Sequence, residues 1–184
     1  NQNLKLLNQI IIKGKTFHKF ISSNEIDLVI KSLSDRINKD YADKEVLFLI
    51  VLNGAFMFAS DLLKQIEGNY RLSFIKLSSY QGLCSNEKVR ELIGIDEDLK
   101  GRDIIIIEDI IDSGNTMECL RELIIAQEPS SLEICTLMFK PKAFKKDYRI
   151  KYVGREISNE FIIGYGFDFD GYGRNIKDIY QLKD

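Results

Sequence analysis

The sequence predicts an α/β protein with a central, mainly parallel sheet flanked by helices. One apolar run, VLFLIVL over residues 46–52, ends at Asn53-Gly54, and a second, IIII over residues 104–107, leads into acidic residues. Short, β-branched runs bounded by turn residues are typical of buried strands. Apolar residues at helical spacing follow each run, and strands that alternate with helices indicate a parallel sheet.

The other elements follow from the same patterns. Residues 23–39 carry apolar side chains at helical spacing, with Ser23 or Asn24 as a candidate N-cap. Residues 70–78 alternate between apolar and polar and predict a strand, whereas the polar stretch 79–98 is long for a connection inside a compact domain. The remaining predicted elements are helices within 55–66 and 117–124 and strands at 132–138, 150–153 and 161–165.

Length and charge limit the class of protein. The 184 residues fit a single domain, 1–184, large enough to bury a core. The 26 basic and 28 acidic residues give a net charge of -2. This balance argues against a nucleic-acid-binding protein, which we would expect to carry a basic surface.

The sequence also argues against a membrane or zinc protein. No apolar run approaches the roughly 20 residues that a membrane-spanning helix needs. The first residues lack the basic start, apolar centre and cleavage site of a signal peptide, so we expect a cytoplasmic protein. His18 is the single histidine and the three cysteines show no paired spacing, which is not the pattern of a zinc site.

The stretch IIIIEDIIDSGNT, residues 104–116, carries the clearest chemistry. In open α/β sheets, ligands bind beyond the carboxyl ends of the strands. The turn before the next helix holds Asp112, Ser113, Gly114, Asn115 and Thr116. The free backbone N–H groups at a helix N-terminus, together with nearby hydroxyls, favour a phosphate group.

Two further acids precede this turn and need a different partner. The carboxylates of Glu108 and Asp109 would repel a phosphate, but they can accept hydrogen bonds from the two hydroxyls of a ribose. We therefore interpret residues 104–116 as a cradle for ribose 5-phosphate. The alternative for residues 112–116 alone is a helix-capping turn without a ligand.

These residues resemble the phosphoribosyl-pyrophosphate (PRPP) motif of type I phosphoribosyltransferases: an apolar strand, two acids, two apolar residues, an acid, Ser or Thr, Gly, any residue, and Thr. Four more segments are similar to the hypoxanthine-guanine branch of that family. The resemblance covers roughly residues 10–182 and implies a small hood formed by terminal segments, with a purine-binding part at about 154–184 and a mobile lid loop at about 79–98. The four segments are Asn53-Gly54, Ser79-Tyr80, Lys140, and residues 160–168 followed by Arg174.

The resemblance implies transfer of ribose 5-phosphate from PRPP to a 6-oxopurine, hypoxanthine and also guanine, with release of pyrophosphate. Asp112 would be the catalytic general base that accepts the purine N7 proton; its other possible role is to cap the phosphate turn. Mg²⁺ would be the cofactor, because it prefers phosphate and carboxylate oxygens. Its protein contacts would come from Glu108, Asp109 and Asp168.

The purine and pyrophosphate residues are also carried over from the family. Lys140 would donate to the 6-oxo group, Phe161 would stack on the purine, and Ile162 and Asp168 would lie at its edge. Without the resemblance, Lys140 would be interpreted as a solvated lysine and Phe161 as a core residue. The pyrophosphate contacts would come from Asn53, Gly54, Ser79, Tyr80 and Arg174, although a surface ion pair is an alternative role for Arg174.

Two departures from the family pattern and several alternatives remain. Asn53 stands where many family members have Lys or Arg, and Ala55 where Gly or Ser is common. The family's peptide bond at Asn53-Gly54 is often cis. The base could instead be xanthine, or adenine, against which Lys140 argues. A regulatory relative that binds nucleotides and RNA without catalysis is a further alternative. The family is commonly dimeric or tetrameric, so we expect a homodimer or homotetramer, with the apolar helix at 55–66 as a candidate interface.

Overall fold

The computed structural model describes residues 8–77, 91–93, 95 and 97–182. The expected lid loop at 79–98 therefore lies largely outside the described residues, and so do Ser79 and Tyr80. A short strand that the sequence analysis did not identify, β5, occupies Glu91–Ile93 within this stretch. It pairs antiparallel with the strand before it.

The core is a mainly parallel sheet, as the sequence predicts. Its strand order is β5-β4-β3-β6-β7-β8, and only the pairing of β5 at the edge is antiparallel. Every residue of β3 is buried, which is why this strand is a continuous apolar run in the sequence. The parallel strands are β4 (Tyr70–Leu77), β3 (Val46–Val51), β6 (Asp103–Ile111), β7 (Ser131–Phe139) and β8 (Tyr152–Glu156).

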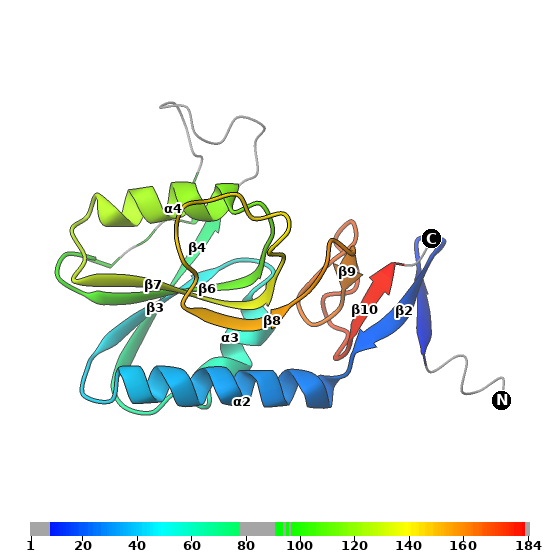
Figure 1. Cartoon of the computed structure of the whole chain (residues 1–184), viewed down its shortest axis with the longest axis horizontal. Helices are drawn as coiled ribbons and strands as arrows, with labels where there is room; N and C mark the ends of the chain where they lie inside the picture. The colour runs from blue at the N-terminus through cyan, green and yellow to red at the C-terminus, as the bar shows by residue number, and fades with distance from the viewer. Residues whose placement is uncertain (1–7, 78–90, 94, 96, 183–184) are drawn as a thin grey trace.

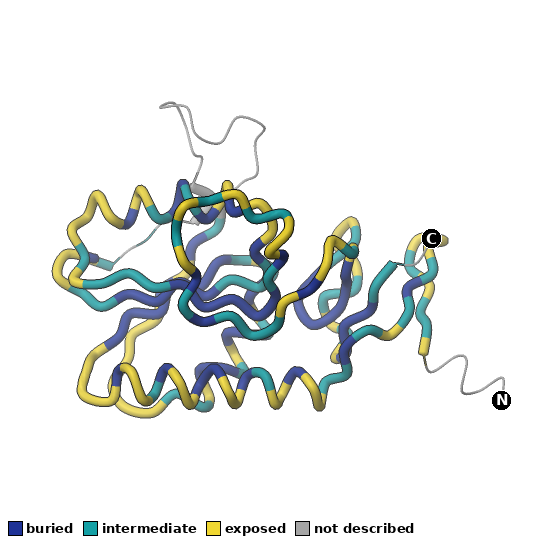
Figure 2. Tube along the Cα trace, in the orientation of Figure 1, coloured by how far each residue is buried: buried dark blue, intermediate teal, exposed yellow. Residues whose placement is uncertain are grey.

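Helices cover both faces of this sheet (Figure 1). The helices α2 (Ser23–Asp40) and α3 (Phe56–Leu63) lie on one face, and α4 (Asn115–Ile125) lies on the other. Alternate residues of β6 point to opposite faces of the sheet: Ile105 packs toward α2 and α3, and Ile106 packs toward α4. Figure 2 shows the same division, with the strands buried and the outer side of α2 exposed.

The start of α2 differs from the prediction by one residue. Ser22, and not Ser23 or Asn24, is the N-cap. Its hydroxyl accepts a hydrogen bond from the backbone N–H of Glu25, and the Glu25 carboxylate accepts one from the backbone N–H of Ser22. This reciprocal capping box stabilises the helix start and explains where α2 begins.

Strand β6 is longer than expected. The sequence analysis ended it at Ile107, but it runs from Asp103 to Ile111, and Glu108 pairs with Thr136 of β7. Glu108 and Asp109 therefore belong to the strand and not to the turn after it. The neighbouring strand β7 pairs with β6 on both sides of Asp109, at Glu108 and Ile110, and so keeps this part of β6 in the sheet.

A second, antiparallel sheet forms the hood at one end of the molecule (Figure 1). Its strand order is β1-β2-β10-β9, so segments from both ends of the described chain lie side by side. Phe17, Ile163 and Tyr180 are buried in its centre. The sequence analysis identified only the segment around β9. The strands are β1 (Gln9–Ile12), β2 (Lys15–Ile21), β10 (Ile179–Leu182) and β9 (Ile162–Ile163).

A buried ion pair joins the hood to the core at the start of α2. The Asp178 carboxylate, 5% exposed, accepts a hydrogen bond from the backbone N–H of Ser23 at 2.7 Å. Lys19 Nζ lies 2.7 Å from the other Asp178 oxygen. Burial raises the pKa of Asp178, but the Lys19 and Ser23 hydrogen bonds outweigh it and lower the pKa overall. The negative charge at the helix N-terminus also suits the helix dipole.

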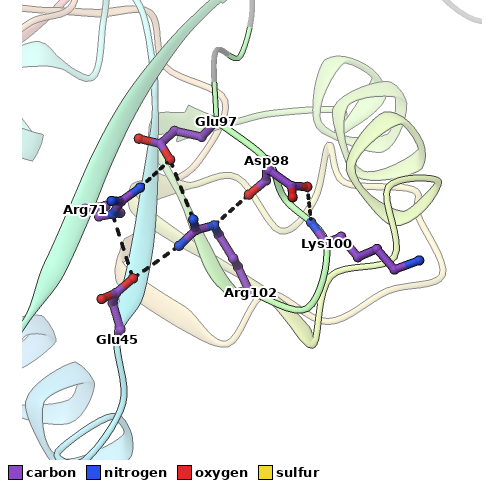
Figure 3. A network of polar contacts seen from close by, with 6 residues as sticks. All are labelled: Glu45, Arg71, Glu97, Asp98, Lys100 and Arg102. Atoms are coloured by element: carbon purple, nitrogen blue, oxygen red, sulfur yellow. Dashed lines mark hydrogen bonds and ion pairs between the residues drawn. The ribbon is translucent and has the colours of Figure 1, made fainter.

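The amino ends of the core strands carry a network of charges (Figure 3). Arg71 of β4 contacts Glu97 at 2.9 Å, and Arg102, just before β6, contacts Glu45 at 3.2 Å. Arg102 also donates to the backbone carbonyl of Asp98.

Among the described helices, none is long and apolar enough to cross a membrane.

Candidate active site

The turn between β6 and α4 has the geometry expected of a phosphate site. Gly114 is the N-cap of α4, with a left-handed φ of 82° that glycine adopts without strain. Asn115 and Thr116 then form the first turn of the helix and are exposed. A pocket of about 190 Å³ opens here, and its lining residues are Glu108 and residues 110–117.

Glu108 and Asp109 lie half-buried beside this pocket. Burial, followed by the charge of Asp109, raises the pKa of Glu108 well above its usual range. Burial also raises the pKa of Asp109, although hydrogen bonds and the charge of Arg174 oppose the increase. Neither carboxylate has an ion-pair partner within 4 Å among the described residues. Two uncompensated acids at a pocket edge are typical of a site that binds a cation or hydroxyl groups.

The turn after β3 packs directly against Asp109. A Cβ atom at Gly54 would overlap the Asp109 carboxylate, and Gly166 of the hood approaches the Gly54 carbonyl from another side. The Leu52–Asn53 peptide bond is cis, one bond earlier than the Asn53-Gly54 bond that the resemblance indicates. The fold therefore brings Asn53-Gly54 and the acidic pair together, as expected for one site.

A second pocket joins the core to the hood. It has a volume of about 280 Å³ and adjoins the first pocket, because Ile110 and Asp112 line both. It brings together all four residues that the resemblance assigns to the purine. Its lining residues are Asp109, Ile110, Asp112, Lys140, Phe161, Ile162, Phe167 and Asp168.

Lys140 and Asp112 face each other in this second pocket. Lys140 Nζ lies 3.0 Å from Asp112 Oδ2, and the Lys140 side chain is 11% exposed whereas the Asp112 side chain is 55% exposed. The backbone N–H of Lys140 donates to the Ile111 carbonyl, which anchors the residue beside β6. Lys140 is therefore not a solvated lysine at a strand end. It is a buried cation whose partner is the predicted general base.

Phe161 is 45% exposed at the pocket and is not a core residue. Its ring centroid lies 6.4 Å from that of Phe17 and 5.8 Å from that of Phe169, so other hood aromatics support it. Ile162 beside it is buried in β9. An exposed ring supported in this way has a face available for stacking.

Asp168 and Arg174 hold each other in the hood. Arg174 Nη2 lies 2.6 Å from Asp168 Oδ1, and Arg174 Nη1 donates to the Gly166 carbonyl at 2.7 Å. The other Asp168 oxygen accepts a hydrogen bond from the backbone N–H of Gly171. Arg174 thus forms an ion pair, its alternative role, and its contact with pyrophosphate remains a prediction.

The sequence analysis included residues 160–168 but assigned no role to two of them, Tyr165 and Phe167. Phe167 lines the second pocket, and the Tyr165 hydroxyl donates to Asp61 Oδ2 of α3 at 2.6 Å. Partners 104 residues apart leave no local pattern that a single sequence could reveal. The glycines of the segment are the one available signal, because Gly164 and Gly166 both have positive φ.

The donor set fits Mg²⁺ bound partly by a ligand. The described residues include no group of three or more acidic, histidine or cysteine side chains that could hold a metal alone. Mg²⁺ does not need one, because it usually binds one or two carboxylates together with phosphate oxygens and water. Glu108 and Asp109 offer two adjacent carboxylates beside the predicted phosphate pocket.

The chain is similar to known proteins over most of its length. A hypoxanthine phosphoribosyltransferase from Haemophilus influenzae is 39% identical over 85% of this chain and 89% of its own length. A hypoxanthine-guanine phosphoribosyltransferase from Staphylococcus aureus is 36% identical over 89% and 92%, respectively.

Solved structures show the same relationship. The crystal structure of a hypoxanthine-guanine phosphoribosyltransferase from Bacillus anthracis has a TM-score of 0.84 at 36% identity and covers 90% of this chain and 96% of its own. A hypoxanthine phosphoribosyltransferase structure from S. aureus has a TM-score of 0.85 at 32% identity, with coverage of 98% and 95%. The family model of the phosphoribosyl transferase domain matches residues 22–170, and this chain therefore belongs to the phosphoribosyltransferase family.

Proposed function

We propose that this protein is a purine salvage enzyme that transfers the 5-phosphoribosyl group of PRPP to hypoxanthine, and to guanine, giving IMP or GMP and pyrophosphate. The observation that carries the proposal is the pair of Lys140 and Asp112, 3.0 Å apart between the two pockets. It places a hydrogen-bond donor and an acceptor side by side.

This pair matches one edge of a 6-oxopurine. On that edge the O6 acceptor lies next to N7, which carries a proton in one tautomer of the free base. Lys140 would donate to O6 while Asp112 accepts the N7 proton as the new N9–C1′ bond forms. Adenine presents an amino group in place of O6, so it would direct a donor at the Lys140 ammonium. The pair therefore supports a preference for 6-oxopurines.

The sugar phosphate would occupy the first pocket. The backbone N–H groups at the start of α4 and the hydroxyls of Ser113 and Thr116 would bind the 5′-phosphate. Glu108 and Asp109 would accept hydrogen bonds from the ribose hydroxyls. Because Asp112 lines both pockets, a base in the second pocket lies next to a ribose in the first.

The leaving pyrophosphate would lie toward the turn at Asn53-Gly54. Backbone N–H groups would bind it there, with contacts from Arg174 and from Ser79 and Tyr80 of the lid loop. Mg²⁺ would neutralise the charge that develops on pyrophosphate. Glu108 and Asp109 would hold it, and Asp168 would contact it through water. A lid that closes over the site would keep water from the reacting sugar.

We also infer a cytoplasmic homodimer or homotetramer. Three exposed apolar side chains, Tyr70, Leu72 and Phe74, alternate along β4, and Phe56 is exposed at the start of α3. Such a surface suits contact with a second copy of the chain. Sedimentation of the wild type and of a Leu72→Glu variant tests the inference, since a monomeric wild type contradicts it.

Product analysis with four purine bases tests the proposed activity. Hypoxanthine, guanine, xanthine and adenine are each incubated with PRPP, with and without Mg²⁺. We expect IMP and GMP to form only with Mg²⁺. Turnover of adenine with hypoxanthine inert would exclude the proposal, whereas a preference for xanthine would support that alternative base.

A regulatory role without catalysis is the remaining alternative. It predicts no transfer to any base together with RNA binding that weakens steeply as salt increases. The net charge of -2 provides no bulk attraction for RNA. RNA retention at low and high salt separates the two functions.

A further inference from the structure

The loop that follows β7, residues 140–151, packs against the back of the phosphate turn (Figure 1). The Tyr148 hydroxyl lies 3.2 Å from the Gly114 carbonyl oxygen and donates to it. Phe144 lies so close that a Cβ atom at Gly114 would be 2.6 Å from its ring. Lys146 of the same loop forms an ion pair of 2.5 Å with Glu118 in the first turn of α4. Three residues of one loop therefore contact the start of this helix.

Aromatic packing keeps these side chains in place. The Phe144 ring centroid lies 5.3 Å from that of Phe139 at the end of β7 and 5.2 Å from that of Tyr148, both in edge-to-face geometry. The Arg121 guanidinium of α4 lies 4.1 Å from the Tyr148 ring centroid. Such contacts stabilise a fixed arrangement of rings. A continuous series of side-chain contacts therefore connects the end of β7, through Phe144 and Tyr148, to α4.

The hydrogen bond from Tyr148 adds to the constraints on how one peptide group of the turn is oriented. The Gly114 carbonyl accepts both this bond and the helical bond from the Glu118 N–H at 2.9 Å. In a trans peptide the C=O and the following N–H point in opposite directions. The Asn115 N–H is therefore turned away from Tyr148, out of the helix end where a phosphate binds. The Asn115 N–H lies 3.5 Å from Ser113 Oγ, at the limit of a hydrogen bond.

We propose that Tyr148 is a positioning residue for the 5′-phosphate, which acts through the Gly114-Asn115 peptide, and that Phe144 supports it. The inference rests on the proposed function, because it deepens the role of the same phosphate turn. Neither residue would touch PRPP. Their effect is to keep the Asn115 N–H oriented toward the phosphate before the ligand arrives, which lowers the cost of binding.

The Tyr148 hydroxyl remains a donor over the working range of the enzyme. Burial raises the pKa of Tyr148 to about 12, so the group keeps its proton at neutral and moderately alkaline pH. The interaction is therefore constant, and removing the hydroxyl is the direct way to measure it.

The first measurement is the effect of Tyr148→Phe on PRPP and on ribose 5-phosphate. We expect KM for PRPP and Kd for ribose 5-phosphate to rise roughly 3- to 10-fold, the fold-change that one neutral hydrogen bond produces. We expect kcat and KM for hypoxanthine to stay unchanged. A Tyr148→Leu variant, which also removes the ring, should show a larger increase in both constants.

Tyr152→Phe is the matched control. The Tyr152 hydroxyl also donates a hydrogen bond, to Asp40 at 2.7 Å, and it lies at the end of α2 remote from the phosphate turn. We expect this variant to lose stability without any change in KM for PRPP. An equal rise of KM in both variants would show that general destabilisation is the cause and would overturn the inference.

Ribose 5-phosphate binding distinguishes failure of the positioning role of Tyr148 from failure of the proposed function. It requires neither a purine nor turnover, so it remains measurable if the enzyme uses another base or none. Wild-type protein that binds ribose 5-phosphate, with Tyr148→Phe equal to it, overturns the positioning role alone. Wild-type protein that binds neither ribose 5-phosphate nor PRPP overturns the proposed function as well.

Discussion

The turn after β6 and the turn after β3 both leave a buried parallel strand and lead into a helix, yet they differ in how they can bind phosphate. The first presents hydroxyls and helix N–H groups from residues 112–116. The second offers no hydroxyl, and its glycine lies close to both the Asp109 carboxylate and Gly166. We expect the first turn to bind phosphate through hydroxyls together with helix N–H groups, and the second through close approach of its backbone alone. The following predictions test that difference.

The largest effect is expected at the first turn. Asp112→Asn should lower kcat by about 10²- to 10⁴-fold, because an amide cannot accept the N7 proton. PRPP binding should be retained, since the phosphate contacts are unchanged. Steady-state kinetics and PRPP binding measure the two quantities, with Asp43→Asn, an exposed residue after α2, as the control. Unchanged turnover would show that Asp112 only caps the turn.

A methyl group at the second turn should have the next largest effect. Gly54→Ala would push Asp109 or the turn aside, and overpacking of this kind costs about 1–3 kcal/mol. We expect kcat/KM for PRPP to fall about 5- to 150-fold. Gly101→Ala is the matched control, because Gly101 has a φ of 69° but open space around it. It should lose stability and keep its kinetics; equal kinetic losses in both variants would contradict the role of close packing.

Removing the charges of Glu108 and Asp109, which lie between the two turns, should weaken PRPP binding and yet stabilise the fold. Glu108→Gln with Asp109→Asn removes two charged acceptors, so KM for PRPP should rise about 10- to 100-fold. The same change should stabilise the metal-free protein at neutral pH, because burial raises the pKa of both acids and so disfavours their charged forms.

The pH dependence distinguishes this explanation from a general packing effect. A carboxyl group with a raised pKa binds its proton more tightly in the folded state. Wild-type stability should therefore fall as the pH rises from the usual Glu value of 4.5 through the folded pKa, and then level off. Thermal unfolding without Mg²⁺ should show the gain of the double variant at pH 7 and its loss near pH 4. A gain that is independent of pH would contradict the electrostatic cause.

The smallest effect is expected at Asn53. If the second turn binds through its backbone, Asn53→Ala should change KM for PRPP by no more than about 2-fold, as for an ordinary surface substitution. Thr116→Ala in the first turn should raise it more, since it removes a hydroxyl from the phosphate. A large effect of Asn53→Ala with none of Thr116→Ala would reverse the comparison.

The same contrast explains how much the sequence could predict. The parallel sheet was predictable because β3 and residues 104–107 of β6 are buried on both faces and therefore consist of apolar residues. Residues 112–116 were predictable because their side chains carry the chemistry. The family resemblance added Lys140 and Phe161, which the structure places in one pocket although their own sequence contexts are ordinary.

The rest depends on contacts between distant segments. The hood strands β1, β2 and β10 have four to seven residues each and mix polar with apolar side chains, so no period distinguishes them. The approach of Gly166 to Gly54 and the support of Gly114 by Phe144 and Tyr148 arise only when the chain has folded. The close approach of two backbone segments has no signal in the sequence other than a glycine.

A crystal structure with bound IMP would show directly whether the two pockets hold one nucleotide. We expect the 5′-phosphate within hydrogen-bond distance of the backbone N–H groups at the start of α4, and the ribose hydroxyls at Glu108 and Asp109. We also expect the purine O6 at Lys140 and N7 at Asp112, in place of the ion pair between these two residues. A nucleotide bound elsewhere, or a phosphate that leaves residues 112–116 without contact, would contradict the expected arrangement.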